Sequence, residues 1–256
     1  MKFSDIINYP LSLLGLKIVR QSSLKKLQLG YMKLRIDDIE KDADFMKLYL
    51  NIKDYTMVEI ERCYALYTSV KYILKNNIPG DFVECGVWKG GSSMLIALML
   101  KKGNILDRKI YMYDTFTGMT EPGNNDGEIE KEEWSKMQKA DGSNDWCFAS
   151  YEEVVTNMES TGYPTENIKL VKGKVEDTIP GIIPTTISML RLDTDWYEST
   201  KHELTHLFPL LKKSGILIID DYGAWQGARK AVDEHFAGNK LAYLNRIDFT
   251  GRLLVK

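Results

Sequence analysis

The sequence Gly80-Asp-Phe-Val-Glu-Cys-Gly-Val-Trp-Lys-Gly-Gly-Ser-Ser93 decides the fold of this chain. Residues Asp81 to Cys85 have the apolar core of a buried strand, and an apolar run from Met94 to Leu100 indicates a buried helix. The glycines between them leave the turn without Cβ atoms, so its backbone can adopt positive φ and approach a ligand closely. The helix start adds unpaired N–H groups. This order of strand, turn and helix predicts a nucleotide-type binding edge.

The spacing of the glycines excludes two common phosphate-binding motifs. Gly86 is followed by Gly90 and Gly91, which is not G-x-G-x-x-G, and no lysine-serine pair of a phosphate loop follows. Glu84, just before the first glycine, suits a cationic ligand better than a pyrophosphate. The sulfonium and ammonium of S-adenosylmethionine, which Rossmann-like methyltransferases bind, are such cations. A tight turn in any other α/β domain is the alternative.

The size and charge of the chain point to a small-molecule protein with one main domain. Its 256 residues can bury one large core, and a net charge of −2 with interleaved acids and bases gives no footprint for nucleic acid. Cys63, Cys85 and Cys147 have neither disulfide parity nor metal-ligand spacing. We therefore expect free thiols and a cytoplasmic protein.

The amino-terminal segment is apolar but too short to span a membrane. Pro10 and Lys17 interrupt the run from Ile6 to Val19, and no small-residue cleavage site follows it. It either docks on a partner subunit or membrane surface, or packs as a helix on its own domain, which we favour. We expect residues 1–54 to be helical and to serve as a lid or in dimerisation, before the main domain at 55–256.

The rest of the chain alternates between strand and helix patterns. Strands are expected at 108–113, 167–171, 187–192 and 216–219, helices at 58–74, 151–160, after Asp195 as far as Lys213, and at 225–237, and a closing hairpin at 241–247 and 252–256. Continuous apolar strands such as 216–219 are typical of parallel sheets covered on both faces.

Acids at two strand ends are placed to bind a nucleotide-like ligand. Asp114 ends the second strand, about 30 residues after Glu84, where it could accept hydrogen bonds from ribose hydroxyls; a turn or capping role is the alternative. Glu176 and Asp177 follow the third strand, where such sheets contact adenine, and a solvated turn is the alternative.

The polar segment from Thr117 to Ser150 interrupts the alternation. It is rich in Gly, Asn, Asp, Glu and Lys, and it contains Trp134 and Trp146. A polar insertion of this length in a compact domain is usually a lid or a disordered segment. We interpret it as an element that covers the substrate, with disorder as the alternative.

Four carboxylates follow two strands that should be neighbours. Asp193 and Asp195 follow the strand at 187–192, and Asp220 and Asp221 follow the next. Ligands in open α/β sheets bind beyond the carboxyl ends of the strands. Because converging carboxylates repel one another, the pattern favours a hard divalent cation, most simply Mg²⁺. Helix capping explains one acid at each junction but not two.

A zinc-protease motif is also present. His202-Glu-Leu-Thr-His206 matches H-E-x-x-H. The apolar face of its helix contains Leu204, Leu207 and Leu211, so at 100° per residue the two histidines should face solvent. A zinc site needs buried histidines and a third ligand. His235 lies on a later helix, so we reject the protease interpretation.

With these motifs in order, residues 55–237 resemble the macrocin O-methyltransferase family, the metal-dependent methyltransferases of sugar hydroxyls. The resemblance rests on the motifs Val83-Glu-Cys-Gly-Val-Trp-Lys-Gly-Gly-Ser92, Tyr113-Asp-Thr-Phe-Thr-Gly118, Glu176-Asp-Thr-Ile-Pro180, Leu190-Arg-Leu-Asp-Thr-Asp-Trp-Tyr-Glu-Ser-Thr200 and Ile219-Asp-Asp-Tyr-Gly223. It implies a Rossmann-like class I methyltransferase fold, α/β, with a mostly parallel seven-stranded sheet, a closing antiparallel hairpin and a helical amino-terminal segment.

The resemblance also implies the ligands and the residues that bind them. Mg²⁺ would be held by Asp193 or Asp195 together with Asp220 and Asp221, and an aspartate of the Asp193 and Asp195 pair would be the general base. The residues implied to bind S-adenosylmethionine are Thr56, Met57, Glu84, Cys85, Gly86, Val87, Ser92, Ser93, Asp114, Thr115, Phe116, Glu176, Asp177 and Asp193. A homodimer is expected.

The implied reaction is O-methylation of a sugar or of a glycosylated small molecule, either a natural product or a precursor of a surface polysaccharide. Two features depart from the family pattern: Thr194 stands where glycine is usual, and the insertion at 117–150 is unusually polar. Both bear on the acceptor. The alternatives are a metal-dependent methyltransferase of catechols or other phenols, and a Rossmann-like binding protein without catalysis.

Overall fold

The computed structural model describes residues 36–238 and 243–256, and the apolar segment Ile6–Val19 lies outside them. The chain divides into two compact units, residues 1–46 and 47–256. The described part of the first unit is helical, and α3 (Ala43–Ile52) continues into the second. Within the described ranges, no helix has both the length and the apolarity needed to cross a membrane. The second unit contains the sheet and the site.

The second unit is built on a seven-stranded sheet of order β3-β2-β1-β4-β5-β7-β6. Five strands are parallel, β7 pairs antiparallel with β5, and β6 pairs antiparallel with β7 at the edge of the sheet. The strands are β1 (Asp81–Cys85), β2 (Ile110–Asp114), β3 (Ile168–Lys172), β4 (Ile187–Leu192), β5 (Leu211–Ile219), β6 (Asn245–Arg246) and β7 (Arg252–Val255). This confirms the predicted mostly parallel sheet with a closing hairpin.

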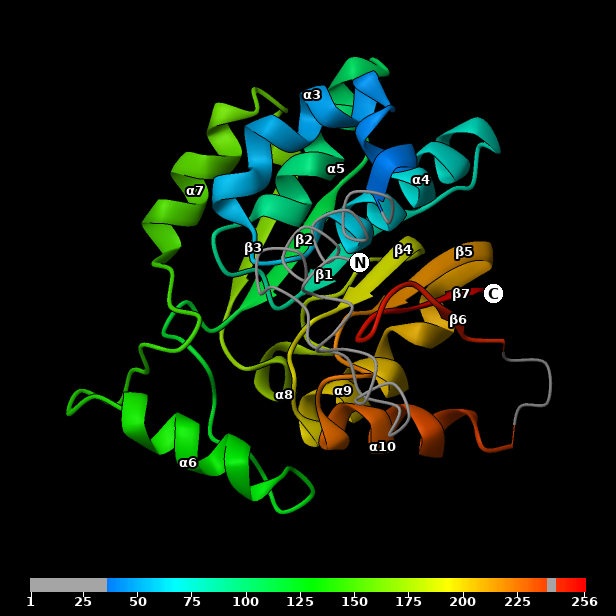
Figure 1. The fold of residues 1–256 in the computed structure, drawn as a ribbon. Coiled ribbons are helices and arrows are strands. Elements are labelled where there is room, and N and C mark those ends of the chain that lie inside the picture. Colours follow the sequence, from blue (N-terminus) through cyan, green and yellow to red (C-terminus); the bar gives the residue numbers. More distant parts are fainter. Residues whose placement is uncertain (1–35, 239–242) are drawn as a thin grey trace, which may run out of the picture. The chain divides into compact units, whose positions relative to one another are not determined.

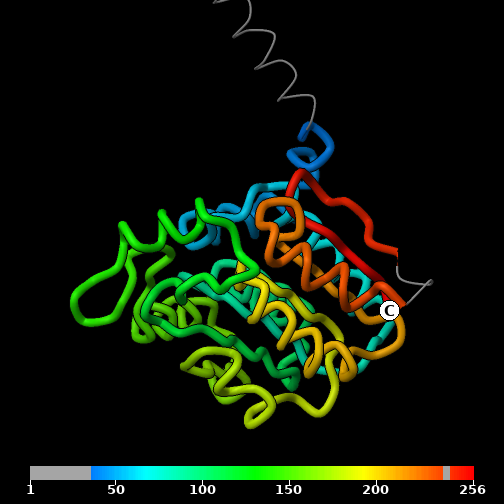
Figure 2. The backbone as a smooth tube through the Cα atoms, turned by 90° about the horizontal axis from the view of Figure 1, so that it is seen from below, coloured from blue at the N-terminus to red at the C-terminus, as the bar shows by residue number. Residues whose placement is uncertain are grey.

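Helices cover both faces of the sheet (Figure 1). One layer contains α4 (Ile60–Lys75), α5 (Gly91–Lys102) and α7 (Tyr151–Ser160). The other contains α8 (Val175–Thr178), α9 (Tyr197–His206) and α10 (Gln226–Phe236), and Figure 2 shows α9 and α10 side by side. Short 3-10 turns lie at Lys53–Tyr55, Thr165–Asn167 and Phe208–Leu210.

The core lies on the central strands, which are buried on both faces. All six residues of β4 are buried, as are the last five of β5, which explains why these strands are continuously apolar. Ser188 and Arg191 are the polar exceptions in β4, and Arg191 has 2% of its surface exposed. A buried cation of this kind requires ion-pair partners. The three cysteines are unpaired, as predicted.

The region between α9 and β5 differs from the prediction. The helix was expected to reach Lys213 but ends at His206, and β5 begins at Leu211. Pro209 lacks a backbone N–H and cannot continue a helix, and Leu211 pairs with Ile187 of β4. The closing hairpin is also shorter than expected, because β6 contains only Asn245 and Arg246.

The insertion at 117–150 is folded and is anchored on the domain. It carries α6 (Glu128–Met137), which Figure 1 shows outside both helix layers. The buried carboxylate of Asp126 accepts the backbone N–H of Tyr197 at 2.9 Å, at the start of α9. The indole of Trp196 donates to the carbonyl of Thr120 at 2.8 Å. Of the two interpretations of this segment, the structure therefore favours an ordered element.

Candidate functional site

A cavity of about 290 Å³ lies at the carboxyl ends of β1, β4 and β5. The glycine turn contributes Gly86, Val87 and Trp88 to its lining, and the insertion contributes Gly118, Met119, Trp146 and Cys147. The remaining lining residues are Met57, Val58, Arg62, Asp114, Asp193, Asp195, Asp220, Asp221, Ala224, Trp225 and Thr250. The predicted binding turn and the predicted acids thus share one cavity.

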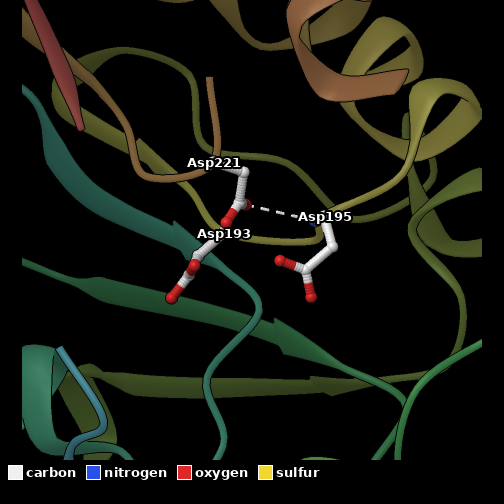
Figure 3. A group of neighbouring side chains, drawn as sticks. All are labelled: Asp193, Asp195 and Asp221. Atoms are coloured by element: carbon white, nitrogen blue, oxygen red, sulfur yellow. Dashed lines mark hydrogen bonds between the residues drawn. The ribbon is translucent and has the colours of Figure 1, made fainter. Parts of the chain in front are cut away.

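Three of the four predicted carboxylates form a cluster in this cavity (Figure 3). Asp193 and Asp195 follow β4, Asp221 follows β5, and each offers an oxygen to a set of ligand atoms that all lie within 4.8 Å of one another. Asp195 has a left-handed backbone with φ of 66°, and its N–H donates to Asp221 Oδ2 at 3.2 Å. The turn after β4 is therefore fixed to the end of β5.

The electrostatics of the cluster fit a divalent cation. Burial, together with repulsion among these acids, raises the pKa values of Asp193 and Asp221 well above their ordinary range. Burial raises the pKa of Asp195 to about 6. Three carboxylate oxygens at this spacing are the hard ligands that Mg²⁺ prefers. In the described part of the chain, this is the one group of acids, histidines or cysteines with metal-ligand spacing.

Asp220, the fourth predicted metal ligand, lies outside the cluster. Its Oδ1 accepts Arg191 Nη2 at 2.6 Å, and its Oδ2 pairs with Arg62. Arg62 also pairs with Asp248 at 3.1 Å. Because both oxygens of Asp220 are bound by guanidinium groups, the geometry assigns it to an ion-pair network beneath the cluster. The set of candidate metal ligands is therefore Asp193, Asp195 and Asp221.

Glu84, like Asp220, is paired with Arg191 inside the protein. It is 1% exposed, its Oε1 accepts Arg191 Nη1 at 2.8 Å and its Oε2 accepts Ser93 Oγ at 2.5 Å. The sequence suggested that this acid faces a cationic ligand, but its charge is satisfied inside the protein. Cys85, Ser92 and Ser93 are buried beside it and line no part of the cavity. These four residues support the turn from below.

Asp114 joins the glycine turn to β2. Its Oδ2 accepts the backbone N–H of Val87 at 2.7 Å and of Trp88 at 3.2 Å, and its Oδ1 accepts that of Phe116 at 2.8 Å. It also borders the cavity, as the ribose interpretation requires. Phe116 is buried against Tyr151.

A smaller cavity of about 60 Å³ adjoins the first and shares Gly86, Asp114 and Asp193 with it. Thr115 and Glu176 line it, together with Lys174 and Thr194. Among the other residues expected to bind the cofactor, Met57 borders the larger cavity, whereas Thr56 and Asp177 line neither. The predicted adenine region thus continues the space at the glycine turn.

The close packing of the glycine turn on the aspartate cluster depends on one glycine. Gly86 has φ of 80°, and a Cβ at this position would lie 1.8 Å from the backbone carbonyl oxygen of Asp193. No side chain fits there. The first glycine of the motif therefore brings the β1 turn into contact with the β4 turn that carries two of the three aspartates.

The family is established by sequence comparison. The profile of the family Macrocin-O-methyltransferase (TylF) matches residues 26–256. The chain belongs to this family. Among curated relatives, it is 33% identical over 183 residues to demethyldecarbamoylnovobiocin O-methyltransferase of Streptomyces niveus, covering 72% of this chain and 68% of the relative. It is 34% identical over 181 residues to an 8-demethyl-8-(2,3-dimethoxy-alpha-L-rhamnosyl)-tetracenomycin-C 4'-O-methyltransferase of Streptomyces olivaceus, covering 71% and 67%.

Solved structures agree with this assignment. The O-methyltransferase NovP matches with a TM-score of 0.71 and 31% identity, covering 79% of this chain and 82% of NovP. The calicheamicin methyltransferase CalS11 matches with a TM-score of 0.60 at 17% identity, covering 95% and 96%, which shows the fold alone. The chain is therefore an O-methyltransferase of the macrocin family with a class I methyltransferase fold.

The H-E-x-x-H sequence does not form a metal site in this family member. The rings of His202 and His206 lie 4.4 Å apart and are half-buried, not turned to solvent as expected, and His202 Nε2 lies 2.8 Å from the carbonyl oxygen of Ile179. Glu203 points away from them and is fully buried, where its Oε1 accepts Thr194 Oγ1 at 2.9 Å. Its role is to hold the turn between Asp193 and Asp195.

Sequence reasoning missed the cations and the indoles of the site. Arg191 interrupts an apolar strand, which was a readable signal of a buried ion pair. Arg62 had no such signal, because it lies on an ordinary amphipathic helix. Trp146, Trp196 and Trp225 meet from distant parts of the sequence, with ring centroids 5.8 to 6.1 Å apart, and only the fold brings them together.

We predict that Arg191→Met destabilises the protein by about 3–5 kcal/mol, because it leaves Glu84, Asp193 and Asp220 as buried carboxylates without their shared cation. Urea unfolding followed by circular dichroism measures this loss. Lys212→Met, at an exposed position of β5, is the matched control and should stay within about 0.5 kcal/mol of wild type. Equal stability of the two variants would contradict the network.

Proposed function

We propose that the chain transfers the methyl group of S-adenosylmethionine to a hydroxyl of a sugar, free or part of a glycosylated small molecule, with Mg²⁺ as the metal. One observation carries the proposal: the cluster of Asp193, Asp195 and Asp221 shares its cavity with the glycine turn. The name of the relative from Streptomyces olivaceus describes 4'-O-methylation of a rhamnosyl-bearing compound, which supports a sugar-bearing acceptor.

The residues divide between the two ligands. Asp193, Asp195 and Asp221 would hold the metal. Gly86, Val87 and Asp114 in the larger cavity, with Thr115 and Glu176 in the adjoining one, would hold the cofactor. When bound, S-adenosylmethionine supplies an electrophilic methyl group, and Mg²⁺ lowers the pKa of a nearby hydroxyl.

Asp195 is the proton acceptor in this proposal. A neutral sugar hydroxyl is a poor nucleophile, so a positioned base has to take its proton as the C–O bond forms. Asp193 Oδ2 accepts Arg191 Nη1 at 2.7 Å, which ties that oxygen to the buried ion-pair network. Asp195 Oδ1 accepts the indole N–H of Trp225 at 2.8 Å. Asp195 thus has a fixed orientation at the cavity, and burial raises its pKa to about 6, close to neutral pH, where a general base works well.

The insertion at 117–150 acts as the lid of the site in this proposal. Its Met119, Trp146 and Cys147 line the cavity, and Asp126 anchors it to the start of α9. Such a cover limits the access of water to the cofactor and positions the acceptor. The insertion is therefore the segment in which acceptor specificity should vary.

The oligomeric state and the cellular location of the protein are also part of the proposal. We infer a homodimer, with residues 1–54 contributing to its interface, and light scattering tests it. Unpaired cysteines fit a reducing cytoplasm.

We predict Mg²⁺-dependent transfer of labelled methyl to neutral glycosides. The assay offers a panel of methyl glycosides and catechols, with and without EDTA. Activity on glycosides should disappear with EDTA and return with Mg²⁺. Activity that ignores EDTA would remove the metal from the proposal, and preference for catechols would replace the sugar acceptor. Cofactor binding without any transfer would indicate a binding protein.

We predict that Asp221→Ala lowers kcat by at least about a hundredfold. The variant removes one of the three aspartates that would hold the metal, so only two ligands remain. Binding of S-adenosylmethionine, measured by calorimetry, should stay within about threefold, since Asp221 lies beyond the glycine turn. His202→Ala should keep wild-type kcat and lose at most the hydrogen bond to Ile179, about 1 kcal/mol of stability. Loss of turnover in the histidine variant alone would reverse these assignments.

We predict that metal affinity falls as the pH drops from about 8 to about 5, because burial raises the pKa values of Asp193 and Asp221 well above their ordinary range and that of Asp195 to about 6. The sign follows because the metal binds the deprotonated carboxylate and competes with the proton. Titration of Mn²⁺ by calorimetry or electron paramagnetic resonance between pH 5 and 8 measures the effect. Affinity that is constant across this range would exclude these three aspartates as the ligands.

A further inference from the structure

Three indoles form a continuous aromatic surface next to the metal cluster. Trp146 belongs to the insertion, Trp196 follows Asp195, and Trp225 precedes α10. The ring of Trp146 meets those of Trp196 at 5.8 Å and 75° and of Trp225 at 6.1 Å and 78°, and the last two rings lie 6.0 Å apart at 58°. We call these three residues the tryptophan wall.

The wall is rigid at its back and open toward the cavity. Trp196 is 2% exposed, and its indole N–H is bound by the carbonyl of Thr120. Trp146 and Trp225 are half-buried and line the cavity. Two aromatic side chains thus present apolar surface to a cavity that five aspartates also line, supported by a third ring that does not line it.

Hydrogen bonding fixes the wall relative to the candidate base. Trp225 Nε1 donates to Asp195 Oδ1 at 2.8 Å, so the indole is in contact with that end of the cluster. On another side, Gly86 packs against the backbone of Asp193 and brings the cofactor turn to the cluster. A molecule held against the wall therefore lies beside Asp195 without occupying the glycine turn.

The charges in the cavity restrict what can lie there. Five aspartates line it, and among its described lining residues Arg62 is the one cation. Arg62 is already paired with Asp220 and Asp248. A phosphate or carboxylate on the acceptor would find no unpaired cationic side chain at the wall. The proposed Mg²⁺ would already be matched by three carboxylates, so the cavity favours an uncharged acceptor.

We propose that Trp146 and Trp225 form the acceptor subsite and bind a neutral pyranose ring by packing against its C–H face. The inference rests on the proposed function and names its substrate class as an uncharged glycoside, not a nucleotide-diphosphate sugar. Indole faces carry partial negative charge and attract polarised C–H groups, and they provide large apolar area with little conformational entropy to lose. The hydroxyls at the ring edge stay free, and one of them can reach Asp195.

The test uses the full chain with methyl α-L-rhamnopyranoside as the probe and saturation-transfer NMR as the binding measurement, without turnover. With the wild-type protein, saturation should be transferred to the C–H protons of the bound probe. Trp146→Ala should weaken binding about tenfold, which corresponds to about 1.4 kcal/mol, and Trp146→Phe should restore most of it. Trp134→Ala is the matched control, because Trp134 belongs to the same insertion, binds the carbonyl of Met119 and lines neither cavity.

Kinetics separate the subsite from the chemistry. Trp146→Ala should raise the acceptor KM about tenfold with kcat within threefold, and it should leave the affinity for S-adenosylmethionine unchanged. Trp225→Phe keeps a ring but removes the N–H donor to Asp195, so it should lower kcat and shift the pH profile while the acceptor KM stays within threefold.

The outcomes distinguish this inference from the proposed function. Methyl transfer with a KM indifferent to Trp146→Ala, or tighter binding of a nucleotide-diphosphate sugar than of the neutral glycoside, would overturn the subsite and leave the proposed function intact. If wild type binds the probe, Trp146→Ala does not, and wild type transfers no methyl group, the subsite would be supported and the proposed function overturned. No saturation in folded wild type would overturn the subsite.

Discussion

A single buried guanidinium decides which carboxylates of the site remain available. Arg191 lies near the carboxyl end of β4 and donates to Glu84, Asp193 and Asp220 from one position. Arg62 takes the remaining oxygen of Asp220. These three acids thereby share a cationic partner, whereas the hydrogen bonds to Asp195 and Asp221 come from uncharged N–H groups. Without these two arginines, five carboxylates would converge on one edge of the sheet with no order among them.

The same network explains why the cluster is poised for a metal ion. Burial and mutual repulsion raise the pKa values of Asp193 and Asp221, although Arg191 pairs with Asp193. In the proposed function, a divalent ion would offset this repulsion. Thr194, which replaces the glycine usual in the family, adds to the rigidity of the turn by donating to the buried Glu203. Its backbone lies outside the positive φ region, so glycine is not required there.

The sequence predicted the fold and the residues that make up the site better than it predicted which of those residues face a ligand and which form ion pairs. The glycine turn, the alternation of strands and helices, and the acids at the ends of β4 and β5 follow from local patterns. The local patterns do not show whether Asp220 and Glu84 face a ligand, because that depends on arginines that are distant in sequence. The convergence of Trp146, Trp196 and Trp225 likewise depends on how the insertion folds back onto α9. The zinc-protease interpretation of the H-E-x-x-H motif disagrees with the family found by sequence comparison. Its histidines are half-buried, and its glutamate supports the turn between Asp193 and Asp195.

The central claim is that Asp193, Asp195 and Asp221 hold one divalent ion beside the glycine turn, with Asp220 excluded by its arginines. Anomalous diffraction from crystals soaked in Mn²⁺ tests it most directly. The account predicts a single strong peak about 2.0–2.4 Å from one oxygen of each of the three aspartates, with the ion pairs of Asp220 unchanged. A peak coordinated by Asp220, or an ion at the two histidines of α9 with none at the cluster, would contradict it.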